Sequence, residues 1–277
     1  MNTIYSPWHK HIPPPLVLFF LCFSLSWSPA HADTLTIEIQ ASLAVRENTL
    51  EGTITVVNRG DEPARKVHAE FAVPGETVVK EVVDLLEVRQ AASFSFKKKL
   101  GEIKPGTYAV PITIVFHDAK LYPFSALACP TFTLGETFSA GLSCSTTPLE
   151  TDGEITFAIK NLESISRRIK ASFLFPREFY CPRPEILFKL EPLERKILSF
   201  NLLRSTAIPG AHYPVFSVLD FETEKGRHCL VCPGEIRFME GGNWFKRTRW
   251  YWLAGWLFLM ALSGGLLFKN RYKLRFF

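Results

Sequence analysis

The stretch between residues 50 and 233 carries nearly the same sequence pattern twice. Four pairs of segments match: Gly52–Asn58 with Gly153–Asn161, Val67–Pro74 with Ile169–Pro176, Pro105–Tyr108 with Pro209–Tyr213, and Cys129-Pro130 with Cys232-Pro233. Matching segments lie about 100 residues apart, which is the size of one β-sandwich domain. We therefore expect two similar domains in tandem.

Within each copy, apolar and polar residues alternate with a period of two, which is typical of half-buried strands. The alternation is clear over Tyr108–Phe116 in the first copy and over Tyr213–Phe221 in the second, where Ser217 interrupts the apolar face. Val78–Val88 comes nearest to an amphipathic helix, but its β-branched residues favour a strand with a loop at least as strongly.

Turn-forming residues divide each copy into about seven short strands. The predicted fold class is all-β, with two tandem immunoglobulin-like antiparallel β-sandwiches and one C-terminal transmembrane helix. Tyr108 and Tyr213 each follow a Pro-Gly pair at the start of a long strand. This placement indicates either a tyrosine corner or a plain strand start with an aromatic residue.

Two hydrophobic segments flank the repeat. The first, Leu16–Trp27, is too short to span a bilayer and is followed by Ala30-His31-Ala32, a small-x-small cleavage pattern, so residues 1–32 are predicted to be a signal peptide. The second, Trp250–Phe268, has no charged residue over about 19 positions. At about 1.5 Å per residue, a helix there matches the hydrocarbon core of a membrane.

These signals predict a complete organisation for the chain. It consists of a signal peptide over 1–32, a first sandwich over 33–135, a second sandwich over 136–240, a stalk over 241–249, a transmembrane helix over 250–268 and a short basic tail over 269–277. A cleaved signal before a single membrane helix predicts that the sandwiches lie outside the cytoplasmic membrane, periplasmic or extracellular, with the C-terminus inside.

The net charge of +5 is small for 277 residues, and much of the excess comes from the two flanks of the membrane segment. Acidic and basic residues are interleaved in the exported part without a basic stripe, which argues against nucleic-acid binding. Clustered positive charges beside an apolar helix fit an anionic lipid surface.

Both copies resemble the bacterial immunoglobulin-like families typified by the cell-adhesion-related domain found in bacteria (CARDB) and its relative attached to α-galactosidases. The resemblance rests on an Asn-x-Gly after a β-rich opening, a strand ending in Pro, a Leu-Glu stretch before the next strand, and Pro-Gly-x-Tyr before a long strand. It implies exported modules that act as spacers, adhesins or assembly parts, and no catalytic residues. The second copy departs from it, because it lacks the Gly after Asn161 and gains cysteines.

Five cysteines remain after the predicted signal peptide. Four of them, Cys144, Cys181, Cys229 and Cys232, are expected near one pole of the second sandwich. They predict two disulfides, of a connectivity that the sequence leaves open, with a four-thiolate zinc site as the alternative. Cys129 is then left over, either buried and free or paired between chains.

Other chemistry finds little support in the sequence. Cys229-x-x-Cys232 lies on a predicted strand, whereas a thioredoxin-like redox pair lies at the start of a helix. The histidines come without the Gly-x-Ser-x-Gly or His-Glu-x-x-His motifs of hydrolases. No cofactor is expected. Ala261 and Gly265 form a small-xxx-small pair, which indicates either a helix-packing face or ordinary glycine usage in a membrane helix.

Three functions follow as hypotheses. The first is a non-enzymatic envelope protein whose sandwiches serve as an interaction or spacer module in a larger assembly, with an envelope or membrane protein as partner. The second is a surface carbohydrate-binding or adhesion protein, which requires exposed aromatic side chains. The third is a thiol redox or metal-binding protein that uses Cys229 and Cys232.

Overall fold

A computed structural model describes residues 36–136, 140–149, 153–208, 211–224, 226–237, 248 and 250–260. The predicted signal peptide, nearly all of the stalk, the tail and the last part of the predicted membrane span, 261–268, lie outside these residues. Residues 250–260 are α-helical. Among the described helices, none is both long and apolar enough to cross a membrane.

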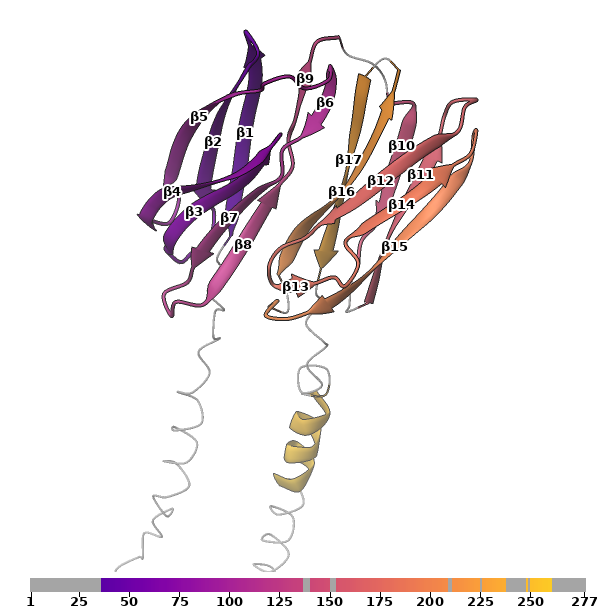
Figure 1. The fold of residues 1–277 in the computed structure, drawn as a ribbon. Coiled ribbons are helices and arrows are strands. Elements are labelled where there is room, and N and C mark those ends of the chain that lie inside the picture. The colour runs from indigo at the N-terminus through magenta and orange to yellow at the C-terminus, as the bar shows by residue number, and fades with distance from the viewer. Residues whose placement is uncertain are drawn as a thin grey trace, which may run out of the picture. The chain divides into compact units, whose positions relative to one another are not determined.

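The rest of the described chain consists of strands and the turns and loops that connect them (Figure 1). The first copy forms β1 (Ile37–Arg46), β2 (Thr49–Asn58), β3 (Ala64–Val73), β4 (Glu76–Leu86), β5 (Ala91–Lys99), β6 (Gly106–Ala109), β7 (Ile112–His117), β8 (Pro123–Ala128) and β9 (Thr131–Leu134). The second forms β10 (Leu142–Thr147), β11 (Gly153–Asn161), β12 (Arg167–Leu174), β13 (Phe179–Tyr180), β14 (Glu185–Leu190), β15 (Arg195–Arg204), β16 (His212–Thr223) and β17 (Gly226–Arg237). The all-β prediction is confirmed, and the ambiguous Val78–Val88 segment is largely strand β4.

Alternating burial along the strands builds two separate apolar cores. One core draws on residues from Leu50 to Phe132, and the other on residues from Leu142 to Ile236. In the first copy the core lies between the sheets β1-β2-β5 and β4-β3-β7-β8, and in the second between β10-β11-β15-β13 and part of a six-stranded sheet. Each copy is thus a sandwich of its own, while the predicted boundaries 33–135 and 136–240 stay predictions.

The same buried asparagine organises one end of each sandwich. The Asn58 side chain donates to the carbonyls of Glu62 and Leu86 at 2.8 and 3.1 Å and accepts from the Gly60 amide at 3.0 Å. Asn161 repeats this pattern with the carbonyls of Ile165 and Glu191 and the amide of Glu163. Both asparagines are fully buried. A buried side-chain amide is tolerated only when it is hydrogen-bonded, so the sequence repeat corresponds to a repeated structural device.

The two sandwiches also share a sheet, which the sequence repeat does not predict. The six-stranded sheet has the order β14-β12-β16-β17-β6-β9, so β6 and β9 of the first copy continue the sheet of the second (Figure 1). The contact is a parallel pairing of Arg227 with Gly106. In the first copy the chain leaves one sheet for the other at Val110-Pro111, between β6 and β7. Pro111 has no amide hydrogen for a sheet ladder, which favours a break at this point.

Candidate functional site: the interface between the sandwiches

The pairing of β6 with β17 brings two backbones into close approach. The Arg227 amide donates to the Pro105 carbonyl at 2.9 Å. A Cβ atom at Gly106 would lie 2.0 Å from the Arg227 carbonyl oxygen, and one at Gly226 would lie 2.4 Å from the Pro105 oxygen. Both glycines have positive φ angles, 143° and 146°. Glycine is therefore required at both positions for this junction to form.

Arg227 also reaches across the junction with its side chain. Its guanidinium lies 4.9 Å from the centre of the Tyr108 ring in the first sandwich. It is held in that place by Asp220 on the neighbouring strand β16, to which Nε donates at 2.9 Å and Nη2 makes a second bond. A cation over an aromatic face and a bidentate carboxylate pair both favour arginine over lysine.

Tyr108 is itself fixed by a tyrosine corner. Its hydroxyl donates to the Lys104 carbonyl at 2.6 Å, and burial raises the pKa of that hydroxyl. In the second copy, the Tyr213 hydroxyl accepts from the Ile208 amide at 2.8 Å. The tyrosine-corner interpretation of the sequence is thus confirmed at Tyr108. The Lys104 ammonium lies 2.5 Å from the Glu222 carboxylate of the second sandwich. Lys104 therefore takes part both in the tyrosine corner, through its carbonyl, and in the junction, through its side chain.

A second junction lies between β8 and the segment that follows β12. The Glu178 carboxylate, 1% exposed, accepts from the amide of Ser125 at 2.7 Å and from its hydroxyl at 2.6 Å. The Ser125 hydroxyl oxygen in turn accepts from the Arg177 amide at 2.8 Å. The Arg177 side chain pairs with Glu70 on β3 at 2.5 Å. This junction therefore joins the sandwiches through a buried serine–carboxylate pair and a more exposed ion pair.

Apolar side chains are buried beside these polar contacts. Val115 of β7, Leu127 of β8 and Val218 of β16 are each less than 10% exposed, yet they belong to neither core. On their strands they point away from the core of their own sandwich, and β8 contacts β16. These residues form an apolar layer between the sandwiches. We call the two junctions and this layer the inter-sandwich interface.

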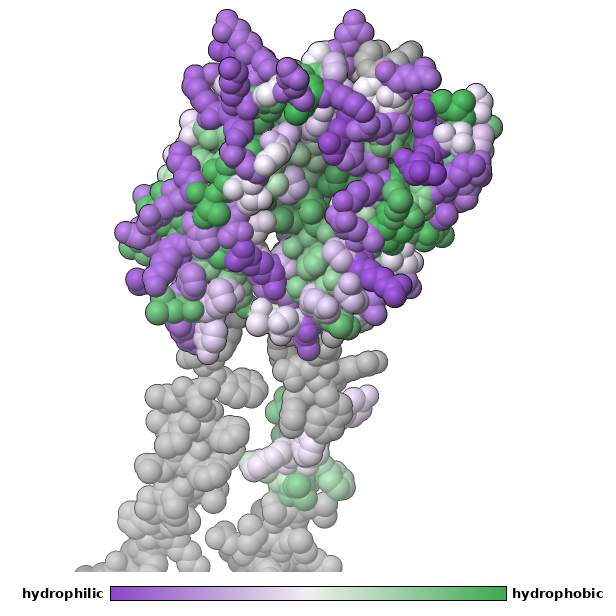
Figure 2. Space-filling model, viewed as in Figure 1, coloured by the Kyte–Doolittle hydropathy of each residue, from purple (hydrophilic) through white to green (hydrophobic). Residues whose placement is uncertain are grey.

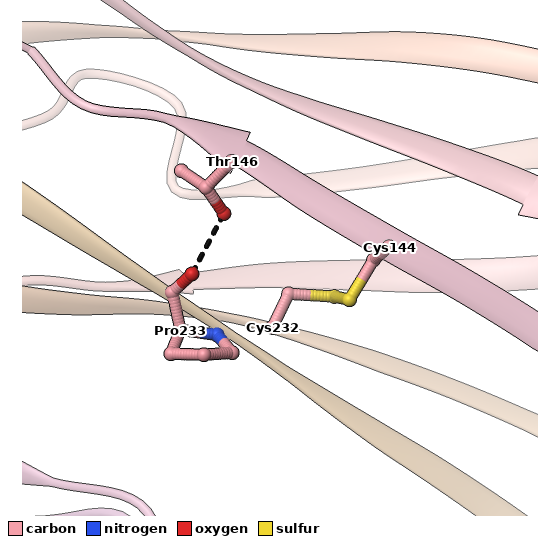
Figure 3. The surroundings of a disulfide bond; sticks show 4 residues. All are labelled: Cys144, Thr146, Cys232 and Pro233. Atoms are coloured by element: carbon pink, nitrogen blue, oxygen red, sulfur yellow. Dashed lines mark hydrogen bonds between the residues drawn. A yellow bond between two sulfur atoms is a disulfide. The ribbon is translucent and has the colours of Figure 1, made fainter.

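The second sandwich contains one disulfide, between Cys144 and Cys232, whose Cα atoms are 6.0 Å apart (Figure 3). It connects β10 in one sheet to β17 in the other. The Thr146 hydroxyl donates to the Pro233 carbonyl at 2.7 Å beside it, so both strands are held at two points. A disulfide in this domain was expected, and its connectivity is now established.

The other cysteines differ from the predicted four-cysteine cluster. Cys181 and Cys229 are unpaired in the structure, and Cys181 belongs to the core of the second sandwich. Cys229 and Cys232 are three residues apart on a regular strand, and side chains at odd spacing point to opposite faces. Cys232 therefore faces the core, and Cys229 faces away from it. This separation removes the geometry needed for Cys229 to share a disulfide pair or a zinc ion with Cys144 and Cys232.

The free thiols are in surroundings that suppress thiol chemistry. Burial raises the pKa of both Cys129 and Cys229 to about 12, and it also raises the pKa of Cys181. Reactive cysteines need a lowered pKa, because the thiolate is the nucleophile and the metal ligand. Within the described ranges, no group of three or more His, Cys, Asp or Glu side chains is placed to hold a metal ion.

The aromatic residues of the second sandwich are mostly core. Phe173, Phe179 and Phe188 are buried, whereas Tyr180 is 58% exposed. This outcome agrees with the strand alternation in the sequence. Ala261 and Gly265, the predicted helix-packing pair, lie outside the described residues.

Comparison with known proteins identifies no family for this chain. No family model matches the chain, and no curated protein does. Solved structures with a similar arrangement include the native α-2-macroglobulin of E. coli (9% identity, TM-score 0.29), which the chain matches over 74% of its own length and 17% of that protein's. They also include red sea bream transglutaminase (9% identity, TM-score 0.28), matched over 80% of this chain and 34% of that protein. A third is the YadV chaperone (9% identity, TM-score 0.28), matched over 73% of this chain and 99% of that protein.

Each copy of the repeat is a β-sandwich of mainly antiparallel strands. The chain spans about a sixth of the α-2-macroglobulin it matches and about a third of the transglutaminase. At these identities and TM-scores, the likeness carries no argument about fold family, activity, substrate or partner.

The inter-sandwich interface was not predicted from the sequence, although one signal for it exists. Ile114-Val115-Phe116 and Val218-Leu219 are unbroken apolar runs within otherwise alternating strands. Such runs indicate burial on both faces of a strand. Ser125 and Glu178 carry no comparable signal, because nothing local distinguishes them from ordinary exposed polar residues.

Proposed function

We propose that the chain is a non-enzymatic, membrane-anchored envelope protein whose two immunoglobulin-like sandwiches act together as a rigid interaction module in a larger assembly. The observation that carries the proposal is the inter-sandwich interface. A flexible spacer needs only a linker, whereas this chain maintains a shared sheet, a buried carboxylate and an apolar layer between its domains. Such contacts fix how two surfaces are presented to a partner.

Exposed apolar side chains supply candidate contact surfaces on the second sandwich. Leu187 on β14, Leu193 in the following turn and Ile197 on β15 are each more than 60% exposed. Figure 2 shows hydrophobic surface in the region of β14 and β15, surrounded by hydrophilic side chains. Large apolar side chains that reach solvent at a sheet edge are common sites of association between proteins.

The membrane anchor is part of this proposal and rests on the sequence. The apolar segment 250–268, the basic tail 269–277 and the signal peptide 1–32 together favour a single-pass topology with the sandwiches outside the cytoplasmic membrane. A protease added to the outer face should then degrade nearly all of the protein. Recovery of intact sandwiches after this treatment would reject the topology. The resemblance to CARDB-type domains fits the same role.

The test of the interaction role is co-purification from mild detergent. The tagged full chain is compared with a version whose residues 250–268 are replaced by an unrelated membrane helix, with Gly106→Ala, and with Gly153→Ala as a matched control. We expect a second envelope component to be retained by the helix replacement and by Gly153→Ala, and to be lost from Gly106→Ala, in which the interface cannot close. Loss of the partner on helix replacement alone would contradict the proposal, because recognition would then lie in the membrane.

The structure gives less support to the two other hypotheses. A carbohydrate platform needs several exposed aromatic rings on one face, but the exposed tyrosines of the described sandwich residues, Tyr122 and Tyr180, lie on different sandwiches. A redox pair at Cys229 and Cys232 is disfavoured by the opposite faces of the two residues, by the Cys144–Cys232 bond, and by the high pKa of Cys229.

A further inference from the structure

Cys129 and Cys229 belong to different sandwiches but face the same interface. The pairing of β7 with β8 continues into the pairing of β6 with β9 without a shift in register. Successive side chains therefore keep pointing to opposite faces of the sheet through Cys129. Phe132 faces the first core, and Cys129 lies three residues before it, on the opposite face. Cys229 lies seven residues before the core residue Ile236, also on the opposite face. Both thiols therefore point out of their own sandwich.

Cys229 is buried and Cys129 is partly buried. Cys229 is 9% exposed although it belongs to neither core, and the backbone of Ala109 in β6 hydrogen-bonds its sulfur. Cys129 follows β8 directly, at the point where β8 gives way to β9. Burial raises the pKa of Cys129 to about 12, and the charge of Cys229 contributes to this rise. Strand β6 pairs on one side with β17, which carries Cys229, and on the other with β9, which begins two residues after Cys129, so the sheet brings the two cysteines to the same part of the interface.

Neither cysteine has another cysteine partner in the part of the chain that the structure describes. Cys144 and Cys232 bond to each other, and Cys181 is in the second core. In the second sandwich Asn161 pairs with Leu142, and Cys144 lies two residues after Leu142 on β10. In the first sandwich Asn58 pairs with Ile37, and the residue two positions later on β1 is Ile39. The first sandwich therefore lacks a counterpart of Cys144 that could pair with Cys129.

We propose that Cys129 and Cys229 form a second disulfide, which joins the two sandwiches covalently across their interface. The inference rests on the proposed export of the chain, because a disulfide persists in an oxidising compartment. The oxidant is a disulfide-bearing exchange partner, such as a dithiol oxidase or oxidised glutathione. One thiolate attacks that disulfide, a mixed disulfide forms, and the second thiolate displaces the partner. The two cysteines lose two protons and two electrons, and the oxidant is reduced to two thiols.

The interface controls when this exchange occurs. In the docked, reduced protein Cys229 is buried, Cys129 is partly buried and both thiols are almost fully protonated, so attack on an oxidant is slow. Exchange is fast only while the sandwiches are apart, during folding or opening. Once formed, the bond is shielded by the same burial. The disulfide thus fixes the docked arrangement after it has been reached.

The experiment uses the full chain, purified in mild detergent without reductant. Free thiols are alkylated with N-ethylmaleimide under denaturing conditions, and the digest is mapped by mass spectrometry. We expect a linked Cys129–Cys229 peptide, a linked Cys144–Cys232 peptide and alkylated Cys181. Full alkylation of both Cys129 and Cys229 beside an intact Cys144–Cys232 bond overturns the proposal, as does a linkage of Cys229 to Cys181.

A separate outcome distinguishes failure of export from failure of the pairing. If Cys144 and Cys232 are also fully alkylated, the chain did not reach an oxidising compartment, and the proposed topology fails. The purified protein is then equilibrated with oxidised glutathione. Formation of the Cys129–Cys229 peptide supports the pairing, and its absence overturns it.

Single substitutions give an independent count of thiols. Cys129→Ser and Cys229→Ser should each release one additional alkylatable cysteine, the former partner, so that the signal from the described cysteines doubles from one thiol to two. Cys181→Ser is the matched control, because it should remove the remaining thiol and leave the Cys129–Cys229 peptide unchanged. An unchanged count in both interface variants overturns the pairing even if one of them folds poorly.

Discussion

Glu178 and Ser125 bond to each other twice across the inter-sandwich interface, through the amide and the hydroxyl of the serine, at 2.7 and 2.6 Å. Glu178 is almost completely removed from water. A buried carboxylate is costly unless hydrogen bonds replace its hydration. Separation of the sandwiches breaks these bonds, and misalignment leaves the carboxylate buried without donors. The pair therefore selects one docked arrangement over nearby alternatives.

Replacement of Glu178 by Gln should weaken this junction. The amide retains one acceptor oxygen but places an NH2 group where an acceptor is required, so we expect a loss of about 1.5–3 kcal/mol in the free energy of unfolding, as for hydrogen bonds to charged groups. Glu185→Gln, at an exposed position of β14, serves as the control. In a double-mutant cycle with Ser125→Ala, measured by urea denaturation, additive effects of the two substitutions would contradict a direct coupling.

Gly106→Ala should open the junction between β6 and β17. The added Cβ meets the carbonyl oxygen, carbon and nitrogen of Arg227, and no side-chain movement can relieve a clash with backbone atoms. We expect faster hydrogen exchange at the Arg227 amide while both cores remain folded. Gly153→Ala is the matched control, because Gly153 has a similar φ of 148° but no atom within 4 Å of the place that a Cβ would take. Equal exchange in the two variants would show that backbone strain, and not the clash, is responsible.

Tyr108→Phe should destabilise the first sandwich by about 1 kcal/mol, because the Lys104 carbonyl loses its donor. The phenyl ring still packs in the core and still faces Arg227, so the loss of stability measures the contribution of the hydroxyl alone. Tyr122→Phe, at a residue 63% exposed, should change stability little. Thermal unfolding of both variants checks this, and equal melting temperatures would argue against a stabilising tyrosine corner.

Reduction of the Cys144–Cys232 bond should act mainly on the second sandwich. The bond closes a loop between cysteines separated by 88 residues, for which the loss of chain entropy in the unfolded state corresponds to about 4–5 kcal/mol. We expect reductant to raise proteolysis within β10–β17 well above that within β1–β5. A uniform rise along the chain would indicate that the sandwiches unfold together.

Acidification should destabilise the second sandwich through His228. Burial and the nearby Arg167 lower the pKa of this residue below its usual 6.5, and its ring stacks on Phe221. As the pH falls through about 6.5, the unfolded chain takes up a proton before the folded one does, so stability decreases until the lower folded pKa is passed. His228→Gln should remove this part of the pH dependence, measured between pH 7.5 and 5. If the free energy of unfolding of His228→Gln depended on pH as steeply as that of the parent protein, other groups would be responsible for the acid destabilisation.

The sequence predicted what local periodicity determines and missed what arises between distant segments. The strands, the tyrosine corner at Tyr108 and a disulfide in the second copy follow from alternation, turn residues and cysteine content. The assignment of Cys229 to the cluster failed because the face of a residue depends on register, and Cys229 and Cys232 differ by an odd number of positions. The Glu178–Ser125 pair joins residues 53 apart in the chain, so no pattern within one strand can reveal it.

The most direct test of the account measures the distance between the two sandwiches in solution. Spin labels are attached to cysteines introduced at Val79 on β4 and Leu187 on β14, both more than 60% exposed. The background carries serine at Cys129, Cys181 and Cys229, so that no covalent link holds the domains. Pulsed electron paramagnetic resonance should then give a single narrow distance distribution, which broadens on addition of Gly106→Ala. A broad distribution in the parent protein would contradict the claim that the interface holds the two sandwiches as one rigid module.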